Sequence, residues 1–473
     1  MIFADLSFVC VFFTVSLFLQ ILIPSVKIKN IILLVCSLVF YAWAGLRFVL
    51  VLLFMVYVCK VGALHIEKAR LNNKRGDVPL GMTVGVCISI LVFFKYTGFL
   101  ASIFDAHLPQ IVLPVGISFY TFQLVSYLFD VYNGETAAQK KYWMLLLYTS
   151  LFHQCIAGPI VRYRDVYDDL TKREMTVEKM SEGISRFSIG LAKKAVLANG
   201  CAQICDPLLN LNAENMAAAT AFSVSLGIII YLFQYYFDFS AYSDMAIGMG
   251  LMYGLRYKEN FNYPFISKSL GELWRRWHIS LGTFFRDYVY IPLGGSRCGN
   301  LVLLRNLFVV WLLTGVWHGA GWNYILWGLY FFLLLAIGKF VVKNHFDFLP
   351  SAVKILGTFL LLALGTILIR FTDLSMAALA VKSIFMLNGN EFITAADLML
   401  FDNNVYFLAA CVAFATPLGN FPRVYLKEKA DAGNVLCLSL YCLTELCLPI
   451  LLLIVSVNAL AGDSYNPFLY FQF

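Results

Sequence analysis

The sequence predicts an all-α, polytopic integral membrane protein. Of its 473 residues, 60% are hydrophobic and only 13% are charged. The mean hydropathy is +0.77, and apolar runs of helical length recur from one end of the chain to the other. Soluble domains carry about 25% charged residues, so this composition excludes an ordinary soluble globular protein.

The apolar runs are the expected membrane helices, in chain order. They cover roughly residues 6–23, 31–40, 48–59, 80–94, 115–131, 143–157, 218–236, 301–311, 324–337, 355–369, 405–415 and 435–460. A helix needs about 20 apolar residues to cross a bilayer, and several of these runs are shorter. We therefore expect tilted, broken or re-entrant segments among them.

The first run is predicted to be a retained membrane anchor, because no basic region precedes it and Lys27 and Lys29 follow it. The 12 cysteines lie mostly within apolar runs, and no two form a Cys-x-x-Cys pair. We interpret them as small hydrophobic residues, and the sequence predicts no disulfide framework and no metal site. No Gly-x-Ser-x-Gly motif is present, which argues against a serine hydrolase.

Basic residues indicate which loops face the cytoplasm. Between Arg256 and Arg305, eight Lys or Arg residues stand against three acids, which supplies +5 of the chain's net charge of +7. The positive-inside rule places this segment, residues 162–194 and the loop around Lys74 at the cytoplasmic side. We expect re-entrant or cytoplasmic-face segments around residues 156–194 and 256–300, within a single integral-membrane domain covering residues 1–473. Most of these charges could serve only topology and contact with anionic headgroups.

An amphipathic helix is predicted after Thr176, which can cap it, with Glu178 in the first turn. Apolar side chains then recur on one face, at Met180, Ile184, Phe187 and Leu191. This pattern is typical of a helix that lies on or enters the membrane surface.

Candidate binding residues concentrate between residues 273 and 327. Six of the eight tryptophans lie there, at positions 274, 277, 311, 317, 322 and 327. Such a cluster fits either an interfacial belt or the wall of a solvated funnel. The segment LWRRWHIS at residues 273–280 favours the funnel, because arginine can bind phosphate through two hydrogen bonds and indole can stack on a base or sugar ring. It is a candidate site for a nucleotide-bearing acyl donor.

His318 is the candidate general base. It lies in the segment WLLTGVWHGAGW at residues 311–322, which carries no other titratable group. Apolar surroundings disfavour the imidazolium, so we expect a neutral ring that can accept a proton. A core histidine bonded to a helix carbonyl is the structural alternative.

A second polar group lies near residue 238. Gln234, Asp238 and Tyr242 repeat at four-residue spacing and therefore share one side of a helix. Asp238 could bind substrate or fix an imidazole tautomer. It could equally bridge two helices or pair with an arginine.

Seven motifs together resemble the membrane-bound O-acyltransferase (MBOAT) family, and most closely its bacterial branch with the alginate O-acetyltransferase membrane subunit. They are LPVGISFYTFQ at residues 113–123, IAGPIVRY at 156–163, DFSAYSD at 238–244, ENFNYP at 259–264, WRRWH at 274–278, FRDY at 285–288 and IPLGG at 291–295. The resemblance implies a ring of tilted and broken helices around a central funnel that faces the cytoplasm. It assigns the family's deep histidine to His318 and its other histidine to His278.

These readings give one functional hypothesis. We expect an O-acetyltransferase of the bacterial inner membrane that moves acetyl from a cytoplasmic thioester, acetyl-CoA, toward an extracytoplasmic polysaccharide, directly or through a partner acetyltransferase. His318 and His278 are the candidate catalytic residues. The candidate substrate and donor residues are Trp274, Arg275, Arg276, Trp277, Arg286, Asp238, Tyr242, Trp317 and Asn323, with Lys268 as a further cation for the donor phosphates. No bound cofactor and no nucleic-acid partner are expected.

Two points accompany this hypothesis. A transporter or flippase of a sugar or acyl carrier is the alternative, because polar residues at depth would also line a conduit. The other histidines, namely His65, His107, His153 and His345, are expected to be solvated or locally hydrogen-bonded.

Overall fold

The computed structural model describes residues 3–106, 108–109, 111–156, 158–343, 345–462, 466–467 and 469. Throughout these residues the regular secondary structure is helical. Eight of the described helices are long and apolar enough to cross a bilayer: α3 (Leu46–Leu71), α4 (Asp77–Ile103), α12 (Ala221–Met252), α15 (Asn300–His318), α16 with η5 (Trp322–Val342), α17 (Ser351–Arg370), α19 (Ala395–Phe414) and α21 (Val435–Gly462). The predicted polytopic all-α class is confirmed.

Shorter helices connect and interrupt these spans. They are η1 (Phe8–Phe13), α1 (Thr14–Leu22), α2 (Val26–Ala42), α5 (Ile117–Asn133), α6 (Tyr142–Ser150), α7 (Phe152–Cys155), α8 (Tyr163–Thr171), α9 (Val177–Ala192), η2 (Lys193–Ala198), α10 (Asn199–Leu209), α11 (Ala213–Ala218), η3 (Pro264–Ile266), α13 (Leu270–Arg276), α14 (Ile279–Phe285), η4 (Arg286–Tyr290), α18 (Leu374–Ile384), η6 (Pro417–Asn420) and α20 (Phe421–Asp431). The elements η1, η2 and η4, together with η5 at the end of α16, are π-helical turns. The expected broken segments are therefore present.

The chain forms two compact units that are interleaved along the sequence. Unit 1 comprises Met1–Phe187, Tyr242–Glu259 and Thr283–Pro292, and unit 2 comprises Ser188–Ala241, Asn260–Gly282 and Leu293–Phe473. Because the chain enters each unit more than once, no single boundary separates them. The single-domain organisation stays a prediction.

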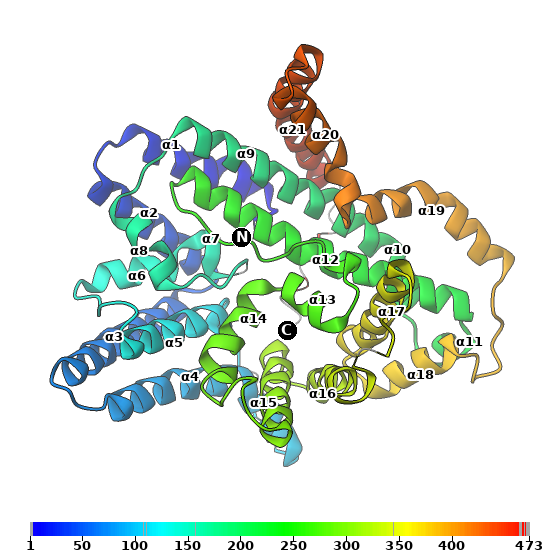
Figure 1. Ribbon diagram of the computed structural model, residues 1–473, viewed down its shortest axis with the longest axis horizontal. Helices are drawn as coiled ribbons and strands as arrows, with labels where there is room; N and C mark the ends of the chain where they lie inside the picture. Colours follow the sequence, from blue (N-terminus) through cyan, green and yellow to red (C-terminus); the bar gives the residue numbers. More distant parts are fainter. Residues whose placement is uncertain are drawn as a thin grey trace. The chain divides into compact units, whose positions relative to one another are not determined.

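Unit 1 is built on α2, α3, α5 and α6, with α4 packed against α3 and α5. Figure 1 shows α3, α4 and α5 side by side. Gly116 begins α5 with a φ of +75°, and a Cβ there would collide with the carbonyl oxygen of Cys155. Only glycine accommodates both this backbone conformation and this close approach. The turn thereby brings the start of α5 against the end of α7.

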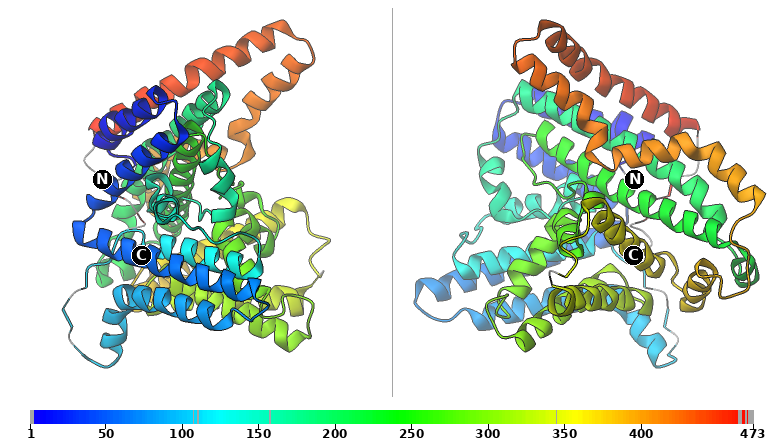
Figure 2. Two further views of the ribbon diagram at one scale, coloured as in Figure 1. Left: turned by 90° about the vertical axis from the view of Figure 1, so that its left-hand side faces the viewer. Right: turned by 45° about the vertical axis from the view of Figure 1, so that its right-hand side comes forward.

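Unit 2 contains two helical hairpins. In the first, α15 packs against α16 and α16 in turn against α17. In the second, α20 folds back on α21, as Figure 2 shows. Arg423 of α20 donates two hydrogen bonds, of 2.5 and 2.8 Å, to Glu445 of α21. Glu445 is the only charged residue of α21, so this ion pair balances a charge in an otherwise apolar span.

The predicted amphipathic helix is α9. The Thr176 hydroxyl accepts a hydrogen bond of 3.2 Å from the backbone N–H of Lys179, and Glu178 lies in the first turn as predicted. Of the predicted apolar face, Phe187 and Leu191 are buried, Met180 is half-buried and Ile184 is 37% exposed. Its placement at a membrane surface stays a prediction.

Candidate active site

His318 is the last residue of α15 and points into the protein. Its side chain is only 5% exposed. The imidazole ring lies edge-on to two indoles, with centroid distances of 5.0 Å to Trp317 and 4.7 Å to Trp327. A Cβ at Gly319 would collide with the ring of Tyr324, so glycine lets the chain leave α15 directly after the histidine. The ring is thus held in a tryptophan-lined interior and does not face lipid.

His278 lies between α13 and α14 and contacts the same indole as His318. Its ring is edge-on to Trp317 at 5.7 Å, and its side chain is 5% exposed. Burial lowers the pKa of His278 to about 4, so the ring is neutral near pH 7. Among the described residues, its Nδ1 has no hydrogen-bond partner. The structure therefore brings the two predicted catalytic histidines together around Trp317.

Asn260 holds the segment that carries His278. Its carbonyl oxygen accepts the backbone N–H of Ile279 at 2.9 Å. Its side-chain Oδ1 accepts the backbone N–H and the hydroxyl of Ser280, at 3.1 and 2.8 Å. These bonds fix the turn on the C-terminal side of His278. Sequence reasoning missed Asn260 as a positioning residue, although it lies inside the ENFNYP motif.

The tryptophans form a packed cluster within unit 2. Trp274 is edge-on to Trp311 at 4.9 Å and to Trp327 at 5.7 Å, and Trp327 contacts His318. Trp277 instead stacks on Tyr235 at 5.5 Å with an interplanar angle of 20°. The two indoles of the WRRWH motif therefore contact different helices: Trp274 packs against α15 and α16, and Trp277 packs against α12.

The cations of the same motif differ in how they are engaged. Arg276 pairs with Glu272 at 3.0 Å and donates to the carbonyl oxygen of Asn262 at 3.1 Å. Arg275 is exposed and forms no hydrogen bond or close ion pair within the described part of the chain, although its charge helps to lower the pKa of the Glu272 carboxyl. The ammonium of Lys268 is likewise exposed, and only its backbone N–H is bonded, to Glu272. Arg275 and Lys268 are therefore the cations of this segment that can still receive an anion.

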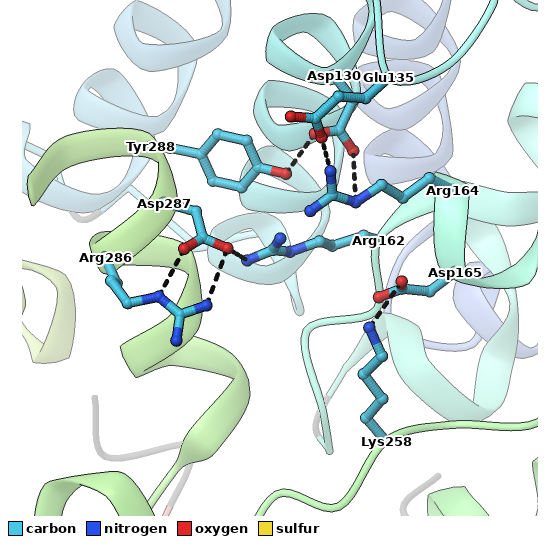
Figure 3. A network of polar contacts seen from close by, with 9 residues as sticks. All are labelled: Asp130, Glu135, Arg162, Arg164, Asp165, Lys258, Arg286, Asp287 and Tyr288. Carbon is cyan, nitrogen blue, oxygen red and sulfur yellow. Dashed lines mark hydrogen bonds and ion pairs between the residues drawn. The ribbon is translucent and has the colours of Figure 1, made fainter. Parts of the chain in front are cut away.

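Arg286 belongs to unit 1 and to a network of charged side chains (Figure 3). Its side chain is 59% exposed, and its guanidinium donates to Asp287 at 2.6 and 3.2 Å, while Arg162 binds the same carboxylate at 2.8 Å. Beside them, Tyr288 donates to Asp130 at 2.7 Å. The carboxylate of Asp287 thus binds the Nε–Nη2 edge of Arg286, the side chain that was predicted to bind donor phosphates.

The rest of the network joins further segments of unit 1. Arg164 pairs with Asp130 at 3.6 Å and with Glu135, and Lys258 pairs with Asp165 at 2.7 Å (Figure 3). The sequence signals for these pairs were the mixed charges at residues 162–165 and 286–287. Which acid meets which base depends on the folded chain.

Asp238 forms a buried ion pair. Its Oδ1 lies 2.8 Å from Nζ of Lys194, and both side chains are 1% exposed. Its Oδ2 accepts the backbone N–H of Leu469 at 3.0 Å. The ion pair matches the structural alternative given for Asp238, namely that it links helices or pairs with a basic residue. The basic residue is a lysine and not the expected arginine. The predicted substrate contact of Asp238 stays a prediction.

Tyr242 and Asn323 are both buried. Tyr242 continues the predicted face of α12 and stacks on Phe3 at 5.5 Å within unit 1. Asn323 lies in the first turn of α16, and its side-chain amide donates to the carbonyl oxygen of Leu368 at 3.0 Å. Asn323 thereby ties α16 to α17, close in sequence to His318.

Of the remaining histidines that the structure describes, His65 and His345 behave as predicted and His153 does not. His153 is fully buried, and its Nδ1 lies 2.7 Å from the Tyr257 hydroxyl. His65 and His345 each bond a nearby helix carbonyl, at 2.8 and 2.7 Å. The local hydrogen bonds of His65 and His345 confirm the expectation, whereas the prediction for His153 was wrong, because its partner is a tyrosine 104 positions away in sequence. His107 lies outside the described residues.

These features define a class: a polytopic helical membrane protein with two buried histidines around one indole and unpaired cations on the neighbouring turn. Residues 141–357, which include both histidines, match the membrane-bound O-acyltransferase family. The chain is 34% identical to the "Probable alginate O-acetylase AlgI" of Azotobacter vinelandii and 36% identical to its namesake in Pseudomonas putida, in both cases over all of both chains. It is 34% identical to the "Peptidoglycan O-acetyltransferase" of Helicobacter pylori, over 76% of this chain and 74% of that one. The chain belongs to the membrane-bound O-acyltransferase family and is a multi-pass membrane O-acyltransferase.

Proposed function

We propose that this protein is an O-acetyltransferase of the bacterial inner membrane. It takes acetyl from acetyl-CoA at the cytoplasmic side and passes it to a cell-surface polysaccharide, directly or through an extracytoplasmic partner enzyme. Its family membership and the names of its relatives, which act on alginate and peptidoglycan, support this proposal. The basic cytoplasmic segments predicted from the sequence support the side from which the donor enters.

The observation that carries the proposal is the tryptophan-lined burial of His318. General bases act best where they are neutral and shielded from bulk water. His318 lies against Trp317 and Trp327, and His278 lies against the same Trp317. Two imidazoles on one indole fit a proton acceptor and a second group that orients a substrate or assists in proton transfer.

The proposed acetyl transfer proceeds through a tetrahedral intermediate. Neutral His318 takes the proton from an acceptor hydroxyl while the oxygen attacks the thioester carbonyl. A C–O bond forms, and the C–S bond breaks as the tetrahedral intermediate collapses. The thiolate of CoA leaves and takes the proton back from the imidazolium, so His318 returns to its neutral form.

The donor phosphates are assigned first to Arg275 and Lys268. Both side chains are exposed and lie on the turns that lead to His278. Arg276 and Arg286 already hold Glu272 and Asp287, so phosphate binding there would compete with an existing ion pair. Trp274, whose buried Nε1 has no hydrogen-bond partner among the described residues, offers one further donor.

The first prediction tests His318. Replacing His318 with Ala removes the proton acceptor and should lower acetyl transfer by about 10²–10⁴-fold, while the protein stays in the membrane. The measurement is release of free CoA thiol by purified protein supplied with acetyl-CoA and acceptor. His345→Ala, which changes an exposed histidine, is the matched control and should keep the normal rate.

A normal rate for His318→Ala would refute the catalytic assignment. Movement of substrate by the wild-type protein without thiol release would support a transporter instead. The polymer itself would be identified by mass spectrometry of polysaccharide and peptidoglycan from cells with and without the protein. Unchanged acetylation of every polymer would contradict the proposed acceptor class.

A further inference from the structure

A buried arginine without a carboxylate partner lies in unit 1, far along the sequence from both histidines. Arg173, in the loop between α8 and α9, is 4% exposed. It donates to the carbonyl oxygen of Tyr253 at 2.7 Å, to Oδ1 of Asn30 at 2.8 Å and to Oε1 of Gln20 at 2.7 Å. All three acceptors are neutral. Within the described residues Arg173 has no ion-pair partner.

The charge of Arg173 is consequently not cancelled. Burial lowers its pKa to about 10, which still leaves the guanidinium protonated near pH 7. The Tyr253 ring, 5.9 Å away, adds only a cation–π contact. A buried charge without a counter-charge is costly, so a site of this kind favours an anion nearby.

Lys29 lies beside this arginine at the start of α2. The backbone carbonyl of Lys29 accepts the amide of Gln20, the residue that also bonds Arg173. Lys29 is half-buried as a residue, and the one atom that its ammonium contacts within hydrogen-bonding range in the described structure is Sδ of Met175, at 3.5 Å. A thioether is a weak acceptor and leaves the ammonium largely unsatisfied.

The surrounding charges do not neutralise the pair. Lys27 and Lys172, close in sequence to Lys29 and Arg173, are exposed and basic. Four acids lie within five residues of Arg173 in sequence. The carboxylate of Asp169 accepts the backbone N–H of Arg256 at 2.9 Å, and Asp168 is exposed. Glu178 is engaged at the first turn of α9, where its own backbone and Thr176 bond it. Glu174 is exposed, and its backbone carbonyl rather than its carboxylate binds Lys179.

Apolar helix faces run away from this cationic cluster. α1 and α2 meet at a short turn just before Lys27, and their outward side chains are apolar and exposed: Phe18, Ile21, Leu22, Ile28, Ile31 and Val35. Two lysines follow the first apolar run, so the positive-inside rule places the turn at the cytoplasmic side. Cations at the end of an exposed apolar surface fit an anionic lipid, because the cations can bind its headgroup and the apolar surface can contact its acyl chains.

We propose that Lys29, supported by the uncancelled charge of Arg173, binds the phosphate of an anionic phospholipid of the cytoplasmic leaflet. The acyl chains lie along the exposed faces of α1 and α2. This site is separate from the transfer chemistry and does not depend on it.

The test measures lipid retention by native mass spectrometry. Purified full-length protein is equilibrated with equal amounts of phosphatidylglycerol and phosphatidylcholine that carry the same acyl chains. Wild-type protein should retain phosphatidylglycerol in preference. Lys29→Ala should lower the bound phosphatidylglycerol about fivefold, because one basic residue near a charged surface contributes about 1 kcal/mol. Lys29→Arg should restore it.

Lys74→Ala is the matched control, since Lys74 is an exposed lysine in the α3–α4 loop that is also predicted to be cytoplasmic. It should leave lipid retention unchanged. Equal retention by Lys29→Ala and Lys74→Ala would overturn the proposal, as would equal binding of the neutral lipid. Full displacement of the lipid by inorganic phosphate at equal concentration would show a free-anion site and would also overturn it.

Discussion

His278 has a backbone conformation that is uncommon for a residue with a Cβ. Its φ of +47° lies in the left-handed region, where a residue with a Cβ is uncommon outside turns and functional sites. The bonds from Asn260 to Ile279 and Ser280 hold the following turn in place. The conformation directs the imidazole to Trp317 while the chain passes from α13 to α14.

Burial of His278 predicts a pH dependence of stability. Its pKa in the folded protein is lowered from 6.5 to about 4, so the unfolded chain binds a proton more readily over that range. The contribution of the buried neutral ring to the free energy of unfolding is therefore fully present above about pH 6.5 and is lost as the pH falls towards 4. We expect His278→Asn to lose less thermal stability than wild type between about pH 7 and about pH 5. Asparagine suits the test because it tolerates the left-handed conformation.

The measurement is the melting temperature of purified protein, followed by tryptophan fluorescence at both pH values. Some loss should remain in the variant, because burial also lowers the pKa of His153, to about 3. His345→Asn should show the full wild-type loss. If His278→Asn loses as much as wild type, the ring is not buried in its neutral form.

At the scale of elements, the α15–α16 hairpin positions His318. A Cβ at Gly315 would lie 2.5 Å from the carbonyl oxygen of Tyr324, and one at Gly328 would collide with the carbonyl oxygen of Trp311. The two helices therefore approach backbone to backbone. This approach brings Trp327 of α16 against His318 at the end of α15.

Gly328→Ala should force the two helices apart. An alanine normally stabilises a helix relative to glycine by about 0.5–1 kcal/mol, whereas overpacking costs about 1–3 kcal/mol. We expect a lower melting temperature and slower acetyl transfer. Gly357→Ala, where a Cβ meets open space in α17, is the control and should be neutral or stabilising. Equal behaviour of the two variants would contradict close packing of the hairpin.

The apolar runs predicted where helices lie but not where they end. The apolar run at residues 218–236 becomes α12, yet the helix continues to Met252. The continuation carries two buried acids in ion pairs, Asp238 with Lys194 and Asp244 with Arg186. The run at residues 143–157 instead breaks at Leu151 into α6 and α7. Hydropathy alone predicts neither the continuation of α12 nor the break between α6 and α7.

At the scale of the whole molecule, the distribution of basic residues predicts topology. The α3–α4 connection carries Lys68, Arg70, Lys74 and Arg75 and should face the cytoplasm, which places the far end of α4 outside. Asn72→Cys should be labelled by a membrane-impermeant maleimide in inside-out vesicles and not in spheroplasts. Ala106→Cys, beyond the other end of α4, should show the reverse pattern.

The signal is read as the increase over wild type, because Cys10, Cys442 and Cys447 are exposed in the native chain. Labelling of Asn72→Cys only from outside would invert the topology. It would also remove the argument that the acyl donor reaches the protein from the cytoplasm.

The sequence by itself determined the membrane class, the family and both candidate catalytic histidines. These follow from composition and from motifs, which are local properties of the chain. Only the tertiary structure decided that Trp317 contacts both His278 and His318. It also decided that Asp287 forms an ion pair with Arg286 and that Lys194 is the ion-pair partner of Asp238. The physical reason is that an ion pair or a ring contact depends on distance in space. Lys194 and Asp238 are 44 positions apart in sequence, and no spacing rule connects them until the helices pack.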